Sequence, residues 1–385
     1  MKWKTCTIAD IGTVVGGATP STKKIENYEN GNIAWVTPKD LAGFSGRFIS
    51  HGERNITEIG LKSCSTQIMP KHSVLFSSRA PIGYVAIANN ELCTNQGFKS
   101  VVPNENTDYM FLYYLLRYNK EKIENMGSGT TFKEVSGNTM RGIEVTVPES
   151  IEDQKKIASI LSTIDDKIER NEAINCNLQE QAQAIYQYMI VENADDSWTP
   201  GVLSDIAIVT MGQSPKGDTY NEDGVGTVFF QGRAEFGFRF PTRRLYTTDP
   251  KRMAQANDAL MSVRAPVGDM NVAYEDCCIG RGLAAIRSKD GHQSFVLYTM
   301  FDLREELNVF NGEGTVFGSI NRDALNSMPI SIPPKIVLDE FEAIVAPMDA
   351  AIRNNYDEIC RLEAIRDSLL PRLMSGELDI SELEL

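Results

Sequence analysis

An internal duplication is the feature that most constrains the fold of this chain. RAPIG at 79–83 recurs as RAPVG at 264–268, and at the same shift Gly97 aligns with Gly282 without a gap. A repeat of this length predicts two similar domains in one polypeptide. Two further pairs of segments align: GSGTTF (127–132) with GEGTVF (312–317), and IADIGTVVGGATP (8–20) with LSDIAIVTMGQSP (203–215).

Length and composition suit two or three globular domains. The chain has 385 residues, of which 42% are apolar and 23% are charged, as in ordinary globular proteins. No run reaches the roughly 18 to 20 apolar residues of a membrane helix, and MKWKTCTIADIG lacks the apolar core of a signal peptide. We therefore expect a cytoplasmic protein.

The negative charge of the chain is concentrated in two segments. The formal net charge is −14. Residues 151–196 hold 4 basic against 10 acidic side chains, and residues 334–385 hold 5 against 12. Residues 1–150 hold 16 against 14, and residues 197–333 hold 13 against 16. These two near-neutral segments remain free to contact phosphates, so the net charge does not exclude nucleic acid as a partner.

Each copy begins with a mixed α and β segment. Short β-rich runs such as SVLFSS and GYVAI are separated by Gly, Pro and Asn turns,. DYMFLYYLLRY (108–118) and QSFVLYTMFDLRE (293–305) carry apolar residues at helical spacing,. We predict an α+β protein with two similar globular domains alternating with two long helices. The predicted boundaries are domains at 1–150 and 197–333 and helices at 151–196 and 334–385.

Each copy ends in a long segment with the apolar spacing of a coiled coil. Pro347 lies inside the second segment and is expected to start or kink its helix. The two helices are expected to pack on each other; the alternative is that each seam caps its own globular domain. Asn171 and Asn355 occupy equivalent seam positions, where a polar residue commonly fixes register. The predicted seam residues are Ile157, Leu161, Ile164, Ile168, Asn171, Leu178 and Ile185 in the first helix, and Phe341, Val345, Met348, Ile352, Asn355, Leu362 and Leu369 in the second.

Sequence motifs for catalysis are missing. The chain has no GxxxxGK[ST], GxGxxG, HExxH or GxSxG pattern, and no Asn-Pro-Pro-aromatic tetrapeptide,. Its seven cysteines and three histidines show no metal-ligand spacing,. Asp165 and Asp166 are expected on the solvated face of a helix. We therefore predict a protein without catalytic residues, metal or cofactor.

The alternation of two globular domains with two long helices resembles the DNA-specificity subunits of type I restriction-modification systems. The resemblance covers essentially the whole chain. Its most specific segments are SSRAPIGYVAI with NQGF, SVRAPVGDMNV, VTVPESIEDQKKIASILSTIDDKI and LLPRLMSGELDI. The chain departs from the family in PESIEDQ and PPKIVLDEF, where Pro is often followed by Glu-Gln, and in IYQYMIVENADDSW, which replaces a Leu-Leu-Pro ending.

The resemblance implies a non-catalytic subunit that gives a complex its sequence specificity. Each globular part would be a target-recognition domain reading half of a split site in double-stranded DNA, and the helices would form an antiparallel coiled coil. The implied partners are two copies of a methyltransferase subunit, which methylates adenine with S-adenosylmethionine, and an ATP-dependent restriction subunit. The alternatives are a coiled-coil scaffold that binds only protein, and a nuclease or methyltransferase with a degenerate active site, which the missing motifs disfavour.

Candidate DNA contacts are basic and hydroxyl side chains in the loops of both domains. Because Pro fixes the backbone and Gly permits a tight turn, Arg-Ala-Pro-x-Gly is interpreted first as a scaffold element. Two alternative roles are accordingly considered for Arg79 and Arg264: a phosphate contact, and an intramolecular salt bridge or turn. The candidates are Lys39, Arg47, Arg79, Ser128, Thr130, Thr131 and Lys133 in the first domain, and Arg233, Arg239, Arg243, Arg244, Arg264 and Thr315 in the second.

Overall fold

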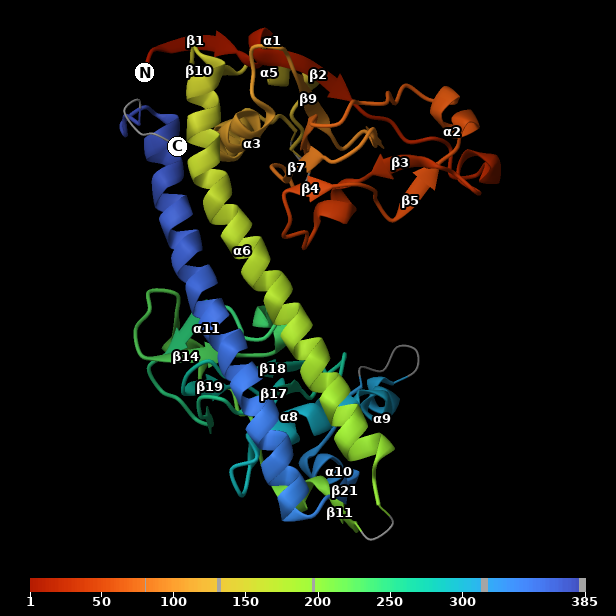
Figure 1. The fold of residues 1–385 in the computed structure, drawn as a ribbon, viewed down its shortest axis with the longest axis vertical. Coiled ribbons are helices and arrows are strands. Elements are labelled where there is room, and N and C mark those ends of the chain that lie inside the picture. Colours follow the sequence, from red (N-terminus) through yellow and green to blue (C-terminus); the bar gives the residue numbers. More distant parts are fainter. Residues whose placement is uncertain (80, 130–132, 196–197, 313–317, 381–385) are drawn as a thin grey trace. The chain divides into compact units, whose positions relative to one another are not determined.

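A computed structural model gives the structure of the protein and describes residues 1–79, 81–129, 133–195, 198–312 and 318–380. The chain divides into two compact units (Figure 1). The first comprises Met1–Ala173 and Tyr356–Leu385, and the second comprises Ile174–Asn355. Each unit contains one α+β globular part and one section of each long helix, which confirms the predicted fold class.

The globular part of the first unit contains three sheets. Their strand orders are β1-β10, β2-β9-β6-β7-β4 and β5-β3-β8. The strands are β1 Trp3–Thr7, β2 Gly12–Gly16, β3 Ile33–Val36, β4 Phe48–Ile49, β5 Arg54–Ile56, β6 Val74–Phe76, β7 Val85–Ala88, β8 Cys93–Thr94, β9 Lys99–Pro103 and β10 Glu144–Pro148. The helices are α1 Ile8–Ile11, α2 Glu58–Lys62, α3 Tyr109–Tyr118, α4 Lys120–Asn125 and α5 Gly137–Arg141.

The second unit has a related arrangement of three sheets. Its sheets have the orders β11-β21, β12-β20-β17-β18 and β13-β15-β14-β19-β16. The strands are β11 Thr199–Val202, β12 Ala207–Met211, β13 Tyr220–Asn221, β14 Thr227–Phe230, β15 Leu245–Thr247, β16 Met253–Ala254, β17 Ala259–Ser262, β18 Met270–Val272, β19 Cys277–Ile279, β20 Leu283–Ser288 and β21 Pro329–Ile332. The helices are α7 Leu203–Ile206, α8 Gln293–Asp302, α9 Arg304–Asn308 and α10 Arg322–Asn326.

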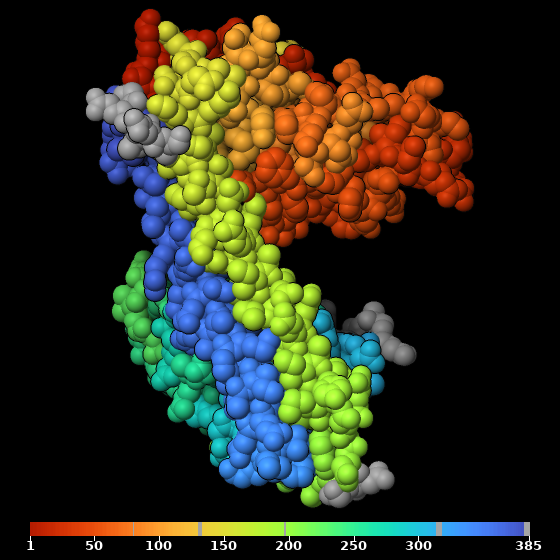
Figure 2. All heavy atoms as spheres, in the orientation of Figure 1, coloured from red at the N-terminus to blue at the C-terminus, as the bar shows by residue number. Residues whose placement is uncertain are grey.

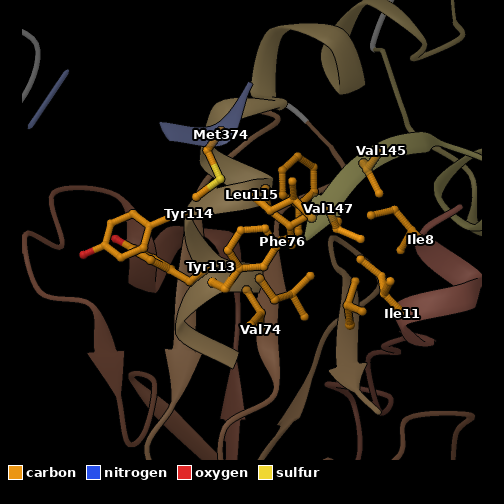
Figure 3. Close-up of a cluster of buried hydrophobic side chains, with 14 of the residues drawn as sticks. Ile8, Ile11, Val74, Phe76, Tyr113, Tyr114, Leu115, Val145, Val147 and Met374 are labelled. Carbon is orange, nitrogen blue, oxygen red and sulfur yellow. The ribbon is translucent and has the colours of Figure 1, made fainter. Parts of the chain in front are cut away.

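The core of the first unit lies on both faces of its largest sheet. Successive side chains of a strand point to opposite faces. Val74 and Phe76 of β6 accordingly join the cluster that also contains α3, whereas Leu75 packs in a separate cluster on the other face. Figure 3 shows the first cluster, to which Met374 of the C-terminal helix also contributes.

The long helices are α6, Ile151–Tyr186, and α11, Lys335–Met374; six residues of π-helix, Gln187–Glu192, follow α6. Of the two expectations for Pro347, a helix start or a kink, the first is wrong, because α11 begins twelve residues earlier and continues through the proline. Packing of the turns before the proline offsets the loss of the N–H that proline lacks. Leu338 and Phe341, for example, are buried before the proline.

The two long helices run antiparallel within each unit. In the first unit the amide of Asn171 donates to Glu358 at 2.8 Å. Asp165, which is nearer the start of α6, accepts from Arg366 at 2.9 Å. In the second unit Asn355 donates to Asn175 at 2.9 Å, and the rings of Tyr186 and Phe341 lie 5.8 Å apart. In both units a later residue of α6 meets an earlier residue of α11.

None of the predicted seam residues is fully exposed. The buried ones are Ile157, Leu161, Ile168, Asn171, Phe341, Val345 and Ile352, and the half-buried ones are Ile164, Leu178, Ile185, Met348, Asn355, Leu362 and Leu369. Ile157 and Leu161 also belong to the core cluster of the first globular part. A single helix face therefore serves both the helix pair and the domain.

The expectation that Asp165 lies on a solvated helix face is wrong. Its side chain is only 5% exposed, because Tyr114 of α3 and Arg366 of α11 cover it from two sides. Asp166, one residue further, has a 58% exposed side chain that pairs with Arg47.

None of the helices in the described ranges is long and apolar enough to cross a membrane.

A histidine joins the start of α8 to α11 in the second unit. His292 Nε2 lies 2.9 Å from Asp339 Oδ1, and its Nδ1 lies 2.9 Å from Asp290 Oδ2. Burial alone lowers the pKa of His292, but the hydrogen bonds to Asp339 and Asp290 outweigh it and the pKa is raised. The neighbouring Glu342 accepts from the backbone N–H of Ser294 at 3.2 Å, and burial raises the pKa of this carboxyl group.

Candidate nucleic-acid interface

Three strand ends meet in the second domain and form a pocket of about 400 Å³. Strands β14 and β19 are parallel, with Phe230 opposite Ile279, so the segments that follow them leave the sheet at the same edge,. The backbone N–H of Gly280 donates to Phe230 at 2.8 Å and holds these segments together. Ser262, the last residue of β17, lies at the same place.

Four arginines line the pocket, three after these strand ends and one directly before β15, and we call them the arginine cluster: Arg233, Arg244, Arg264 and Arg281. Arg244 donates to Glu235 at 2.7 Å and lies 3.4 Å from Glu222. Arg233 pairs with Asp269. Within the described part of the chain, no carboxylate lies within salt-bridge distance of Arg264 or Arg281, and both are exposed.

The cluster has the chemistry of a nucleic-acid contact. Arginine presents up to five N–H donors that match phosphate oxygens and the O6 and N7 acceptors of guanine. Glu235 is 6% exposed and accepts a hydrogen bond from Arg244. This bond limits the orientations of the Arg244 side chain before binding, so less conformational freedom is lost when a ligand binds. Exposed guanidinium groups without carboxylate partners keep their full charge available to an anionic ligand.

The corresponding surface of the first domain is less basic. Strands β3 and β8 are also parallel, with Val36 opposite Thr94, and this pairing aligns Lys39 with Arg233 and Gln96 with Arg281. Lys39 pairs with Glu53 at 2.9 Å. Arg79, the counterpart of Arg264, lies 3.1 Å from Glu134. The same scaffold thus presents different side chains in the two domains.

Equivalent hydrogen bonds close the repeated Arg-Ala-Pro-x-Gly segment in both domains, although Ala80 lies outside the described residues. Ser77 Oγ donates to the carbonyl of Pro81 at 2.8 Å and accepts from Tyr84 N at 2.8 Å. Ser262 makes the equivalent bonds to Pro266 and Asp269 at 2.6 and 3.0 Å. Gly83 and Gly268 have φ of +93° and +91°, a region that other residues rarely adopt. The turn positions its arginine whatever that side chain contacts.

Other predicted contact residues lie in different surroundings. Arg243 pairs with Glu275 at 2.5 Å and lies over the ring of Tyr274. Ser128 is exposed and forms a backbone ladder with Glu134, and Lys133 is exposed beside it. Thr130, Thr131 and Thr315 lie outside the described residues.

Arg47 and Arg239 face the long helices instead of solvent. Each is 4% exposed. Arg47 bonds Asp166 and Glu169 of α6, and Arg239 bonds Asp349 of α11 and Gln179 of α6. We therefore leave both out of the proposed set of DNA contacts.

Sequence reasoning missed Arg281 and Glu235. Gly282 aligns with Gly97 in the duplication, and that alignment could have drawn attention to the residue before it.

Within the described ranges, no three His, Cys, Asp or Glu side chains group as ligands for a metal ion.

Comparison with known proteins identifies the family to which this architecture belongs. Residues 1–180 match the family described as the type I restriction modification DNA specificity domain. The type I restriction enzyme MjaIX specificity subunit of Methanocaldococcus jannaschii is 32% identical over 414 residues, covering 99% of this chain and 94% of that one. The EcoR124I/EcoR124II specificity subunit of Escherichia coli is 30% identical over 172 residues, covering 43% and 41%.

A solved structure has the same fold. The crystal structure of the S subunit of a type I restriction-modification system from M. genitalium covers 99% of this chain and 97% of its own, with a TM-score of 0.60 and 16% sequence identity.

Proposed function

Because the chain belongs to the family of type I restriction-modification DNA specificity subunits, we propose that it binds double-stranded DNA and selects the site on which its complex acts. The arginine cluster at the strand ends of the second domain carries this proposal. A cluster of exposed guanidinium groups in a chain of net charge −14 is the footprint of a local anionic ligand.

We propose that the site is asymmetric and has two parts. Residues 1–150 and 197–333 are the two target-recognition domains, and each reads one half. The counterparts Arg233 and Lys39, and Arg281 and Gln96, differ in length, charge and hydrogen-bonding groups. Because base readout depends on donors and acceptors at the base edges, unlike side chains on one scaffold select unlike bases.

The helical segments 151–196 and 334–385 set the spacing between the halves in this proposal. Two recognition modules on one face of B-DNA require half-sites about 34 to 36 Å apart. The 36 residues of α6 and the 40 residues of α11 correspond to roughly 54 and 60 Å of helix at 1.5 Å per residue. Helices of this length are sufficient to hold such a separation.

The long helices also dock methyltransferase subunits in this proposal, with two copies expected from the duplication. Several apolar side chains on them are exposed: Ile174, Tyr188, Ile344 and Ile365 are between 42% and 64% exposed. On the face drawn in Figure 2, side chains of α6 (yellow to green) and α11 (blue) lie uncovered along much of each helix. Uncovered apolar side chains are suited to a protein partner.

The methyltransferase subunits, not this chain, methylate adenine with S-adenosylmethionine in this proposal, and an ATP-dependent restriction subunit joins the same complex. The proposed cytoplasmic location follows from the DNA substrate.

DNA binding across a range of salt concentrations tests the proposal. The chain is purified in complex with its methyltransferase subunit, and the double variant Arg264→Ala/Arg281→Ala is compared with Lys216→Ala/Arg322→Ala, which removes two exposed cations outside the pocket. Log K falls as log salt rises, and each lost phosphate contact makes this slope less steep by about 0.9. We expect a slope less steep by about one to two in the first variant and unchanged in the second. Absence of salt-dependent DNA binding by the parent complex would favour a protein-only scaffold.

A further inference from the structure

A buried polar junction joins each globular part to the long helices, and the duplication has preserved it. In the first unit, Tyr114 Oη of α3 donates to Asp165 Oδ2 of α6 at 2.6 Å. In the second unit, Tyr298 Oη of α8 donates to Asp349 Oδ1 of α11 at 3.0 Å. Both tyrosines are 0% exposed. They occupy the same position of their helices, as do the two aspartates.

An arginine completes the junction in each unit. The carbonyl of Arg47 accepts from Ile87 N at 2.7 Å, and the carbonyl of Arg239 accepts from Val272 N at 2.9 Å. Ile87 of β7 and Val272 of β18 are counterparts in equivalent strands, so the two arginines occupy the same place in the fold. We call Arg47, Tyr114 and Asp165, with their counterparts Arg239, Tyr298 and Asp349, the helix junction.

The junction contacts both long helices in each unit. In the second unit Arg239 bonds Asp349 of α11 and also Gln179 of α6, at 3.2 Å for the latter. In the first unit Asp165 of α6 accepts from Arg366 of α11 at 2.9 Å. Arg47 bonds the neighbouring carboxylates Asp166 and Glu169 of α6 instead of Asp165, with its Nε 2.9 Å from Glu169. One polar cluster thus fixes three elements relative to one another.

The arginine of each junction lies in the same loop as candidate DNA contacts. Arg239 lies six residues after Arg233 and five before Arg244, which line the pocket. Arg47 follows Lys39 in the corresponding loop. A guanidinium group hydrogen-bonded at two points, as Arg47 is to two carboxylates and Arg239 is to a carboxylate and an amide oxygen, has a defined orientation as well as position,. The loop is thereby held in a fixed rotation on the helices.

We propose that the helix junction positions the recognition loops, so that it and the helices together determine which spacer length between half-sites the chain accepts. The inference rests on the proposed DNA-reading function and deepens it. The junction residues touch no base in this account and act only through the loop they hold. Apolar contacts alone would resist separation of domain and helix, but they are not directional and would permit small rotations.

The experiment uses the complete complex and duplexes that carry its methylated sequence with the natural spacer or with one base pair more or fewer. Tyr114→Phe and Tyr298→Phe each remove one hydroxyl from a junction. Tyr28→Phe and Tyr220→Phe are the matched controls, because their hydroxyls donate to Pro20 and Pro215 inside the domains. The measured quantity is the ratio of initial methylation rates on natural and altered spacers.

We expect Tyr114→Phe and Tyr298→Phe to lower this ratio about tenfold, as loss of a hydrogen bond to a charged group implies. The controls should keep the ratio of the parent. A merely structural role would lower the rates on all spacers in proportion and leave the ratio unchanged, which would overturn the inference. Asp349→Asn provides a second test, since it keeps an acceptor for Tyr298 but removes the charge, and should also lower the ratio.

Failure of the inference and failure of the proposed function give different results. A parent complex that discriminates between spacers, with variants that discriminate equally well, overturns only the inference. A parent complex that methylates all spacers equally, or none, overturns the proposed function and the inference with it.

Discussion

Replacement of Asp165 by alanine is expected to destabilise the first unit strongly. The carboxylate accepts hydrogen bonds from Tyr114 at 2.6 Å and Arg366 at 2.9 Å, and Arg117 lies 3.6 Å away. The side chains of Asp165 and Arg366 are 5% and 13% exposed. Asp165→Ala would leave a buried hydroxyl and a largely buried guanidinium group without their shared acceptor.

The loss of unfolding free energy depends on the contacts that the former partners of Asp165 keep. Removal of one partner of a buried ion pair costs about 3 to 5 kcal/mol. Arg366 keeps a contact with Asp367 at 2.9 Å, but the Asp367 side chain is 62% exposed and compensates only in part. We therefore predict a loss near the lower limit, about 3 kcal/mol of unfolding free energy. The double variant Asp165→Ala/Arg366→Ala should cost less than the sum of the single variants by about 1 to 3 kcal/mol.

Urea unfolding followed by tryptophan fluorescence and circular dichroism measures these changes. Trp3 and Trp35 report on the first unit and Trp198 on the second. The unfolding transition of the first unit should shift to lower urea concentration with the same dependence of the unfolding free energy on urea, because the surface exposed on unfolding is unchanged. A loss below about 1 kcal/mol, or additive losses in the double variant, would refute the reasoning and would favour an exposed carboxylate.

Three further predictions test other parts of the structure. Arg79→Ala, which removes a cation already paired with a glutamate, should leave the salt dependence of DNA binding unchanged, whereas Arg264→Ala should make the slope of log K against log salt less steep by about one; equal effects would contradict the assignment. The pKa of His292 is raised above its ordinary 6.5, so its stabilisation is complete below about pH 6.5 and is lost as pH rises through the folded pKa. The unfolding free-energy difference between the parent and His292→Gln should therefore shrink from pH 6 to pH 8.5, and a constant difference would contradict this. Ile352→Ala, at a buried seam position, should cost about 3 kcal/mol, while Ile365→Ala should cost under about 0.5 kcal/mol yet weaken binding of the methyltransferase subunit.

The sequence predicted the repeat and the helix pair because both depend on periodic patterns. The seam spacing identified Ile157, Leu161 and Phe341, which are buried, and the aligned turns identified the equivalent serine-closed loops. Apolar periodicity is repeated many times along a helix, so single polar exceptions do not obscure it.

The environment of individual charges could not be predicted in the same way. Asp165 stands beside Asp166 in the sequence, yet only Asp165 is buried, because a buried carboxylate depends on partners far along the chain such as Arg366. Arg239 lies in the most basic loop of the chain and still faces the helices. Composition indicates that a loop is basic, but tertiary contacts decide which of its cations reach solvent.

The central claim is that each globular part reads one half of a two-part DNA sequence. Sequencing of methylated adenines in cells that carry the chain and its methyltransferase tests this claim most directly, together with a second strain in which residues 197–333 are replaced by a copy of residues 1–150. We predict one asymmetric sequence with a fixed gap in the first strain, and a sequence with two identical, inverted halves in the second. An uninterrupted methylated sequence, or a sequence that does not change after the replacement, would contradict the account.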